Sequence, residues 1–435
     1  MFMHIYFSGI GGAGIGPLAE IAMQAGYSVS GSDKRMSSYI KALNKAGIEN
    51  IAIDQSYDHI AAVHAEKPID WLVYSSALVF EQPDAPELKF ASEHNIRATK
   101  RDELINEIVT TKKLKMVAVA GTHGKTTTTA MIVWLCKQLG LNVSYLLPAK
   151  TSFGPMGQYL TDSEYFVIEA DEFDRNFMHF NPWLSVISGV SWDHHEIFPT
   201  RAEYKQAFLD FIAQSQHSLI WRDDAMYLAL DKVEQPAVTI QEPNGDVINA
   251  IKLKGFYNRL DGWQAVSALK LMTEADPSKL VKSINLFPGL SRRMEQLLPN
   301  LYTDYAHTPE KIRGVMSVAK EMAAETKQNI VVVYEPLTDR RQHYMLNDYR
   351  DCFDGATQVY WLPSYLARED PNQRILPPAE LITHLSDPTI AQPAEKDAGL
   401  RRTIEAHLEK GDLVVGIAGG GGDSLDDWLR DNFLV

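Results

Sequence analysis

Short apolar segments alternate with amphipathic ones along the first hundred residues. Strand-like runs occupy positions 4–9, 27–33 and 71–77, and a helical pattern covers positions 17–25. This alternation is typical of a parallel α/β sheet, because parallel strands need a crossover connection between them. The pattern predicts a parallel α/β domain at the start of the chain, and a polar, helical stretch at 100–113 marks its end.

The same alternation continues to the carboxyl end. A second region begins with the apolar strand 116–121 and the long helix 126–139, and a third contains strands at 329–336 and 412–418. The Pro- and acid-containing stretch 369–399 shows no such pattern, and we expect it to be an irregular surface excursion. The sequence therefore predicts three α/β domains, with bounds 1–111, 112–293 and 294–435.

Composition and charge narrow the class of protein. A chain of 435 residues, 45% of them hydrophobic, can bury a core in each of two or three domains. It has no apolar run of about 18 residues and no basic leader, so we expect a soluble cytoplasmic protein without a membrane partner. A net charge of −14 without a Lys/Arg cluster argues against nucleic acid. Cys136 and Cys352 are isolated and predict neither a disulfide nor a zinc site.

The strongest chemical signal is a Gly-containing loop between a predicted strand and a predicted helix. Its glycines let backbone N–H groups face a phosphate, Lys125 can reach the outer phosphates, and the Thr126 hydroxyl can bind Mg²⁺. The full P-loop pattern has Gly where this chain has Val119, and a tight turn with an incidental Lys is the alternative. The residues predicted to surround the phosphates are Gly121, Thr122, His123, Gly124, Lys125, Thr126 and Thr127.

A second Gly-rich turn follows the first predicted strand. Gly9, Gly11 and Gly14 fit the pattern G-x-G-x-x-G, and Asp33 lies at the end of the next strand. Alone, this pattern predicts an NAD site, and a purely steric tight turn is the alternative. Because a P-loop follows in the same chain, a third interpretation is that the turn holds the diphosphate of a nucleotide substrate.

Acidic residues follow two further strands of the central region. Four carboxylates occur in the six residues 169–174, at the end of the strand VIEAD, and Asp193 and His194 follow the strand SVISGVS. Such clusters are usually solvated loop ends. At the carboxyl edge of a parallel sheet, however, they can complete a Mg²⁺ site, so we predict Glu169 as a metal ligand and His194 as a ligand of a second metal or of the transferred phosphate.

A pair of arginines marks the end of the central region. Arg292 and Arg293 precede Asp304 and His307, which open the third region. Arginines at a hinge can be purely structural, or they can close onto a γ-phosphate when domains come together.

These segments together resemble the Mur ligase family, and the resemblance covers essentially all 435 residues. It implies an α/β fold with an N-terminal Rossmann-like UDP-binding domain, a central P-loop ATPase domain and a C-terminal Rossmann-like domain. It also implies ATP and one or two Mg²⁺ ions as cofactors. The segments that carry it are GIGGAGIG, SGSD, YSSAL, KRDEL, AGTHGKTTTT, IEADEFD, WDHHEIF, RRM, TDYAHTP and GIAGGGGD, of which AGTHGKTTTT is the most specific.

The resemblance implies a role for each matching residue. Lys125, Glu169, His194 and Arg293 would be catalytic, and Thr126, Glu169 and His194 would bind metal. The P-loop, Asn258, Arg293 and Asp304 would bind ATP, and His307 and Arg341 the amino acid. The UDP-sugar would contact Gly9, Gly11, Gly12, Gly14, Asp33, Ser75, Ser76 and Arg101.

Some positions depart from the family pattern. Tyr257 and Asp261 replace a His and an Asn that contact adenine in other members, and the segment 335–341 differs from the usual amino-acid-binding sequence. Phe208 aligns with a Lys that members adding later residues carbamylate, which favours a member that adds the first residue or a peptide.

The implied reaction joins L-alanine to the carboxylate of UDP-N-acetylmuramate through an acyl phosphate, in peptidoglycan precursor synthesis, by a monomer or weak homodimer. A member that attaches a whole tripeptide to the same acceptor is the first alternative. An NAD-dependent oxidoreductase is a more distant alternative, because it leaves the P-loop unexplained. A non-catalytic nucleotide switch is a third, and an assay would identify it by phosphate release that ignores the amino acid.

Overall fold

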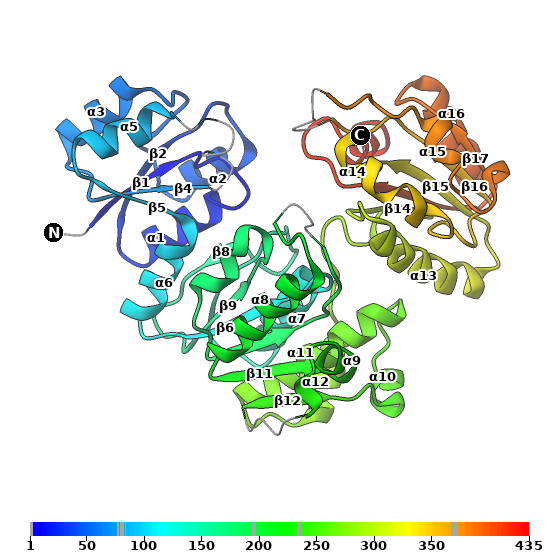
Figure 1. Ribbon diagram of the computed structural model, residues 1–435, viewed down its shortest axis with the longest axis horizontal. Coiled ribbons are helices and arrows are strands. Elements are labelled where there is room, and N and C mark those ends of the chain that lie inside the picture. Colours follow the sequence, from blue (N-terminus) through cyan, green and yellow to red (C-terminus); the bar gives the residue numbers. More distant parts are fainter. Residues whose placement is uncertain are drawn as a thin grey trace. The chain divides into compact units, whose positions relative to one another are not determined.

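The computed structural model describes residues 3–75, 78, 82, 84–193, 197–232, 237–366 and 372–434. Its backbone forms two compact units, Met1–Ile251 with Asp261–Phe287, and Lys252–Leu260 with Pro288–Val435. The first unit contains two β-sheets and the second contains one (Figure 1). The predicted α/β fold is confirmed, and the backbone contains three sheets.

The first sheet has five parallel strands in the order β3-β2-β1-β4-β5. Its central strand β1 has five successive buried residues, as expected for a strand covered on both faces. Hydroxyl side chains begin two of the helices, since Ser37 accepts from the N–H of Ile40 and Ser56 from that of His59. The strands are β1 His4–Ser8, β2 Ser28–Ser32, β3 Ile51–Ala52, β4 Trp71–Tyr74 and β5 Arg97–Lys100, and the helices are α1 Gly16–Gln24, α2 Ser38–Lys45, α3 Tyr57–Glu66, α5 Pro86–Glu93 and α6 Arg101–Thr111.

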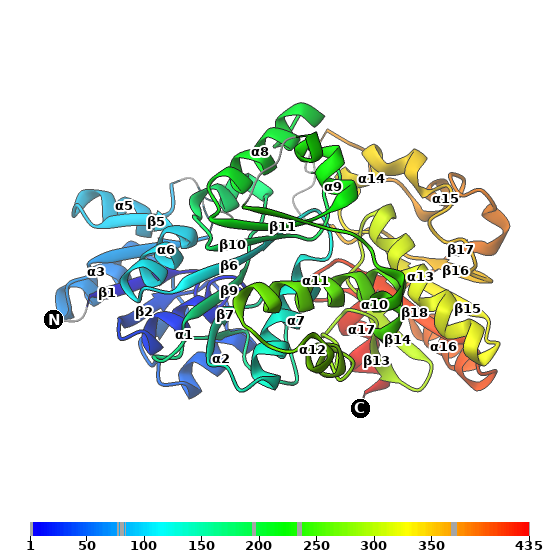
Figure 2. The ribbon, with the colours of Figure 1, turned by 90° about the horizontal axis from the view of Figure 1, so that it is seen from below.

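The second sheet has seven strands in the order β12-β11-β10-β6-β9-β7-β8, and only the pairing of β7 with β8 is antiparallel. Figure 2 shows this sheet between α8 on one side and α7 with α12 on the other. Its strands are β6 Lys115–Ala120, β7 Val143–Leu146, β8 Gly157–Gln158, β9 Tyr165–Glu169, β10 Leu184–Ile187, β11 His217–Trp221 and β12 Val238–Gln241. Its helices are α7 Lys125–Gln138, η1 Phe173–His179, α8 Arg201–Ala213, α9 Arg222–Tyr227, η2 Leu230–Lys232, α10 Gly245–Ala250, α11 Phe256–Met272 and α12 Pro277–Ile284.

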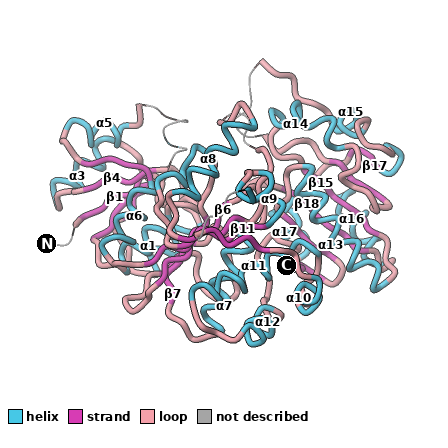
Figure 3. The backbone as a smooth tube through the Cα atoms, turned by 60° about the horizontal axis from the view of Figure 1, so that its bottom comes forward, coloured by secondary structure: helices cyan, strands magenta, loops and turns pink. Residues whose placement is uncertain are grey.

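The third sheet has six strands in the order β13-β14-β18-β15-β16-β17, parallel except for β13. Strand β15 is buried on both faces: Val332 and Tyr334 pack with α13, and Val331 and Val333 pack with α16 and α17. Figure 3 shows β15 and β18 among these helices. The elements are β13 Glu295–Leu298, β14 Leu301–Asp304, α13 Pro309–Thr326, β15 Ile330–Glu335, α14 Asp339–Met345, η3 Leu346–Tyr349, β16 Gln358–Trp361, α15 Pro378–Ile382, η4 Pro388–Ile390, β17 Ala391–Pro393, α16 Ala398–Glu409, β18 Leu413–Ala418 and α17 Leu425–Phe433.

One prediction is wrong. The stretch 369–399, expected to be irregular, contributes α15 and the edge strand β17, which pairs in parallel with β16. Leu381 and Ile382 are buried in the core of this unit. Both elements are too short to show a periodicity in the sequence, so burial and strand pairing, which are tertiary effects, determine their structure. In the described part of the chain, no helix is long and apolar enough to cross a bilayer.

Candidate active site

The loop between β6 and α7 passes through two glycines with left-handed backbone angles. Gly121 has φ +144° and Gly124 has φ +76°. A Cβ on Gly121 would lie 2.5 Å from Ser188 Oγ, and one on Gly124 would lie 2.7 Å from Asp261 Oδ1. Both the backbone angles and the close neighbours therefore require glycine at these two positions.

Thr122 and His123 fasten this loop to the end of β10. The buried Thr122 donates its N–H to Gly189 O at 2.8 Å and its hydroxyl to Ser191 O at 2.6 Å. Tyr204 Oη lies 2.7 Å from the same hydroxyl oxygen. The His123 ring packs so closely on Gly189 that a Cβ there would clash with it. Both side chains therefore support the loop from behind.

Lys125, the first residue of α7, lies among carboxylates. Its Nζ donates to Glu172 Oε2 at 2.7 Å and to Gly121 O at 2.6 Å, and Asp171 Oδ1 is 3.9 Å away. Burial disfavours the ammonium, but the negative charges of Glu172, Asp171 and Glu169 outweigh this effect and raise the pKa of Lys125. The loop therefore has a permanent positive charge beside it.

Thr126 and Glu169 form the oxygen pair that the sequence predicts for Mg²⁺. Thr126 Oγ1 donates to Glu169 Oε2 at 2.7 Å, and Glu169 ends β9, the neighbour of β6. A hydroxyl and a carboxylate fit Mg²⁺, which prefers oxygen ligands and keeps water and phosphate oxygens in its shell. No group of three or more His, Cys, Asp or Glu that could hold a metal occurs among the residues that the structure describes. The predicted ligand His194 lies outside those residues.

Asp261 is a site residue that the sequence did not place here. In sequence it occupies a predicted adenine position, but its carboxyl group lies against Gly124 of the loop. The side chain is buried, and burial raises the pKa of its carboxyl to about 8. An acid that is largely neutral at pH 7 thus lies behind the phosphate-binding loop. No local signal could identify it, because the contact depends on how α11 packs.

The N-terminal turn is braced by Asp33. Gly9 has φ +76°, and its carbonyl accepts the N–H of Gly12 at 3.1 Å. Asp33 Oδ2 accepts the N–H of Gly11 at 2.8 Å, and Asp33 Oδ1 accepts that of Arg35 at 3.2 Å. In an NAD site the corresponding acid binds ribose, whereas Asp33 here binds the turn itself.

Arg101 lies over the same turn. Its Nη1 is so near Gly14 that a Cβ there would lie 2.5 Å away, so glycine makes room for the guanidinium. Ser75 follows β4, next to β1 in the sheet, and Ser76 lies outside the described residues. The structure thus gathers the predicted Gly9–Gly14 turn, Asp33 and Arg101 at one edge of the first sheet.

In the second unit, the two arginines surround Tyr305. The guanidinium carbons of Arg292 and Arg293 lie 4.5 and 5.3 Å from the centre of its ring. Buried Asp304 accepts the N–H groups of Met294 and Ala306, both at 2.8 Å. Burial raises the pKa of Asp304, and the charge of Arg293 opposes this effect. Asp304 therefore fixes the loop that carries both arginines.

His307 is partly buried in the same unit, beside Gly419. Burial lowers its pKa well below the usual range, and the positive charges of Lys311, Arg341 and Arg293 lower it further. The imidazole is therefore neutral at pH 7. The structure thus brings the predicted residues Arg293, His307 and Arg341 close together.

Asn258 is predicted to contact ATP. In the structure its side-chain amide donates to Lys254 O at 2.7 Å.

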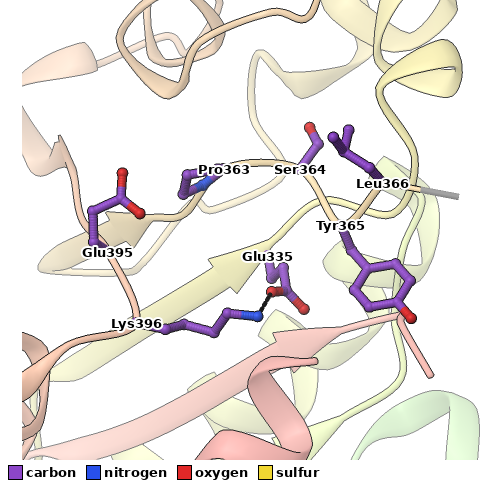
Figure 4. Close-up of a pocket in the computed structure, with 7 residues that line it drawn as sticks. All are labelled: Glu335, Pro363, Ser364, Tyr365, Leu366, Glu395 and Lys396. Carbon is purple, nitrogen blue, oxygen red and sulfur yellow. Dashed lines mark hydrogen bonds and ion pairs between the residues drawn. The ribbon is translucent and has the colours of Figure 1, made fainter. Parts of the chain in front are cut away.

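A pocket of about 420 Å³ lies at the carboxyl end of β15 (Figure 4). Glu335, the first residue of the divergent segment 335–341, lies on its floor and accepts from Lys396 Nζ at 2.6 Å and from the N–H of Leu425 at 2.8 Å. Tyr365 donates its hydroxyl to Gly422 O at 3.0 Å. Glu335 and Tyr365 therefore support the Gly-rich loop after β18 from its two sides of contact, the N–H of Leu425 and the carbonyl of Gly422.

A Gly-rich loop between a central parallel strand and a helix, with Lys and Thr at the start of that helix, defines a P-loop nucleotide-binding protein of the α/β class. Two sequence models of the Mur ligase family match the chain, the catalytic domain over residues 4–113 and the middle domain over residues 119–267. The chain belongs to the Mur ligase family and is therefore a ligase.

Curated relatives agree with this assignment, and solved structures share the fold. The chain is 28% identical to the UDP-N-acetylmuramate–L-alanine ligase of Clostridium perfringens, over 84% of each chain. It is 29% identical to that of Acetivibrio thermocellus, over 100% of this chain and 97% of the relative. The structure of the Thermotoga maritima enzyme of that name matches with a TM-score of 0.74 at 22% identity, over 99% of this chain and 98% of the other. A murein peptide ligase from Psychrobacter arcticus matches with 0.65 at 20%, over the same shares.

Proposed function

We propose that this protein uses ATP to join L-alanine to the carboxylate of UDP-N-acetylmuramate, in the cytoplasm, as a step of peptidoglycan precursor synthesis. Curated relatives that cover almost the whole chain carry the name of this activity. The single observation that carries the chemistry is the cluster at the start of α7, where Lys125 and Thr126 lie 2.7 Å from two different glutamates.

This cluster suits a triphosphate with its metal. A γ-phosphate would compete with Glu172 and Asp171 for the Lys125 ammonium, and the raised pKa keeps that group charged at every physiological pH. Thr126 and Glu169 would hold Mg²⁺, which neutralises charge on the phosphate oxygens when it is bound. Thr122 and His123 keep the loop backbone in place.

The proposed reaction has two steps. A carboxylate oxygen of the muramyl group attacks the γ-phosphorus of ATP, the bond to the β-phosphate oxygen breaks, and ADP leaves. The neutral amine of alanine then attacks the carbonyl carbon of the acyl phosphate, inorganic phosphate leaves, and the amine loses a proton to solvent. Lys125 stabilises the charge of the transferred group, and no covalent bond to the protein forms.

The remaining predicted residues receive binding roles. Gly9–Gly14, Asp33, Ser75, Ser76 and Arg101 would bind the nucleotide sugar. Arg293, Asn258 and Asp304 would serve ATP, and His307 and Arg341 would bind the amino acid. Since His307 is held neutral, it can accept a hydrogen bond from the amine of an incoming amino acid.

Phosphate release with UDP-N-acetylmuramate, ATP and Mg²⁺ tests the proposal. We expect release that depends on both UDP-N-acetylmuramate and L-alanine, and weaker release with glycine or serine. A second candidate, ligation of a tripeptide, is favoured by the structural match to a murein peptide ligase and by the divergent segment 335–341. If phosphate is released with the tripeptide but not with L-alanine, the tripeptide is the substrate. If no amine supports phosphate release, both candidates are wrong.

A further inference from the structure

A carboxylate is buried behind the N-terminal Gly-rich turn. Glu87 lies in the first turn of α5, and only 1% of its surface is exposed. The reaction proposed above does not use it. A carboxylate that leaves water for a protein interior costs free energy unless hydrogen bonds compensate, so its partners indicate what it does.

The partners of Glu87 are three hydroxyl groups from the first sheet. Tyr6 Oη donates to Oε1 at 2.8 Å, and the hydroxyls of Ser32 and Ser8 make short hydrogen bonds to Oε1 and Oε2. Gln55 Nε2 in turn donates to Ser8 Oγ at 3.1 Å. Burial raises the pKa of Glu87, and the hydroxyl donors offset part of this effect. In the described part of the chain the hydrogen-bond partners of Glu87 are neutral, so this carboxylate is held by hydroxyls.

Two of these hydroxyls belong to the residues that carry the turn. Ser8 and Ser32 are the last residues of β1 and β2 and lie opposite each other in the parallel pairing. Ser8 directly precedes Gly9, and Ser32 O accepts the N–H groups of Gly9 and Ile10, both at 2.9 Å. A movement of either serine would therefore tilt the first amides of the turn.

We propose that Glu87 is a positioning residue for nucleotide-sugar binding. Its carboxylate ties the ends of β1 and β2 together through Ser8 and Ser32, and this fixes the course of the turn that would hold the diphosphate. The inference rests on the proposed function, because it needs the turn to bind a diphosphate. An apolar side chain could fill the same space without a buried charge, so the carboxylate serves orientation more than packing.

Binding of UDP, measured by calorimetry, tests this inference. We expect Glu87→Ala to raise the Kd for UDP about tenfold, because three hydroxyl donors lose their acceptor. Glu87→Gln keeps the shape and one acceptor oxygen, and we expect it to raise the Kd about threefold. The KM for UDP-N-acetylmuramate should follow the Kd, while kcat and the KM for ATP change less than about twofold.

Glu93→Gln is the matched control. Glu93 is on the same helix, accepts from Tyr57 Oη at 2.6 Å and has a side chain that is 46% exposed, so its loss should leave UDP binding unchanged. Ser32→Ala removes one donor and leaves the carboxylate in place. If Glu87 acts through Ser32, the effects of Glu87→Gln and Ser32→Ala on the Kd are less than additive.

The results separate this inference from the proposed function. If the unaltered protein does not bind UDP, the nucleotide-sugar assignment fails and the inference fails with it. If the protein binds UDP and folded Glu87→Gln and Glu87→Ala bind it equally well, only the role of Glu87 is wrong. Equal losses in kcat and in the KM values for both nucleotides would indicate a general structural role and would also overturn the inference.

Discussion

The first unit contains two Gly-rich turns between a strand and a helix, and the two turns have different charged side chains around them. The N-terminal turn gives the N–H of Gly11 to Asp33 and lies under Arg101. The central turn has a lysine on the helix, one carboxylate at the end of the neighbouring strand and another just after it. The first arrangement suits a diphosphate that is bound and left intact, and the second suits a phosphoryl group that is transferred with a metal. Glycine spacing alone does not distinguish these roles, whereas the charged neighbours do.

The largest expected effect comes from removing the positive charge of the central turn. Lys125→Ala should reduce phosphate release at least about a thousand-fold while UDP binding is unchanged, because Lys125 serves only the transferred group. Exposed Lys115, which pairs with exposed Glu164 at 2.7 Å, provides the control Lys115→Ala. Normal turnover in folded Lys125→Ala would show that the central turn is not the site of transfer.

The oxygen pair comes next. Glu169→Gln should raise the Mg²⁺ concentration for half-maximal activity at least about tenfold, since an amide is a poorer magnesium ligand than a carboxylate. A Mg²⁺ titration at saturating ATP measures this change. An unaltered Mg²⁺ requirement would remove Glu169 from the proposed metal site.

A smaller effect is expected at the N-terminal turn. Asp33→Ala frees the N–H of Gly11 and should weaken UDP binding about fivefold, with turnover at saturating substrate unchanged. Asp33→Asn retains an acceptor oxygen and should restore most of the affinity. A strong loss of turnover in Asp33→Ala would mean that the two turns are not functionally distinct.

Asp261 should make the stability of the central turn depend on pH. Its carboxyl has a pKa of about 8 in the folded protein against an ordinary value of 3.8, so the folded protein keeps a proton that the unfolded chain loses. The free energy of unfolding should therefore fall as the pH rises from about 4 to about 8 and stay level above that. Asp261→Asn should remove this slope, which thermal unfolding at a series of pH values measures.

Ionised Asp261 should also repel a triphosphate. Above pH 8 the KM for ATP should rise about threefold in the unaltered protein and stay flat in Asp261→Asn. If both proteins show the same profile, Asp261 does not affect the nucleotide through its charge.

Local patterns in the sequence were sufficient for much of the fold and for part of the site. The apolar runs identify β1, β6, β9 and β15. The loop through Gly124 and Lys125 can be recognised from the sequence alone. The contacts of Asp261 and Glu87 were not predictable, because they bring together residues that are distant in sequence. The stretch 369–399 was misjudged for a similar reason, since β17 exists only through its pairing with β16. The roles of all the predicted site residues remain predictions, and Ser76 and His194 lie outside the described residues.

The amino terminus of helix α17 determines whether the preceding Gly-rich segment Gly419–Gly422 can bind a phosphate. A free helix amino terminus after glycines attracts phosphate, but Glu335 already accepts the N–H of Leu425 there and carries its own counter-charge in Lys396. An incoming phosphate would have to displace an internal carboxylate. The sequence of this Gly-rich segment is like that of a phosphate-binding loop, but the carboxylate of Glu335 already occupies the helix amino terminus that a phosphate would bind.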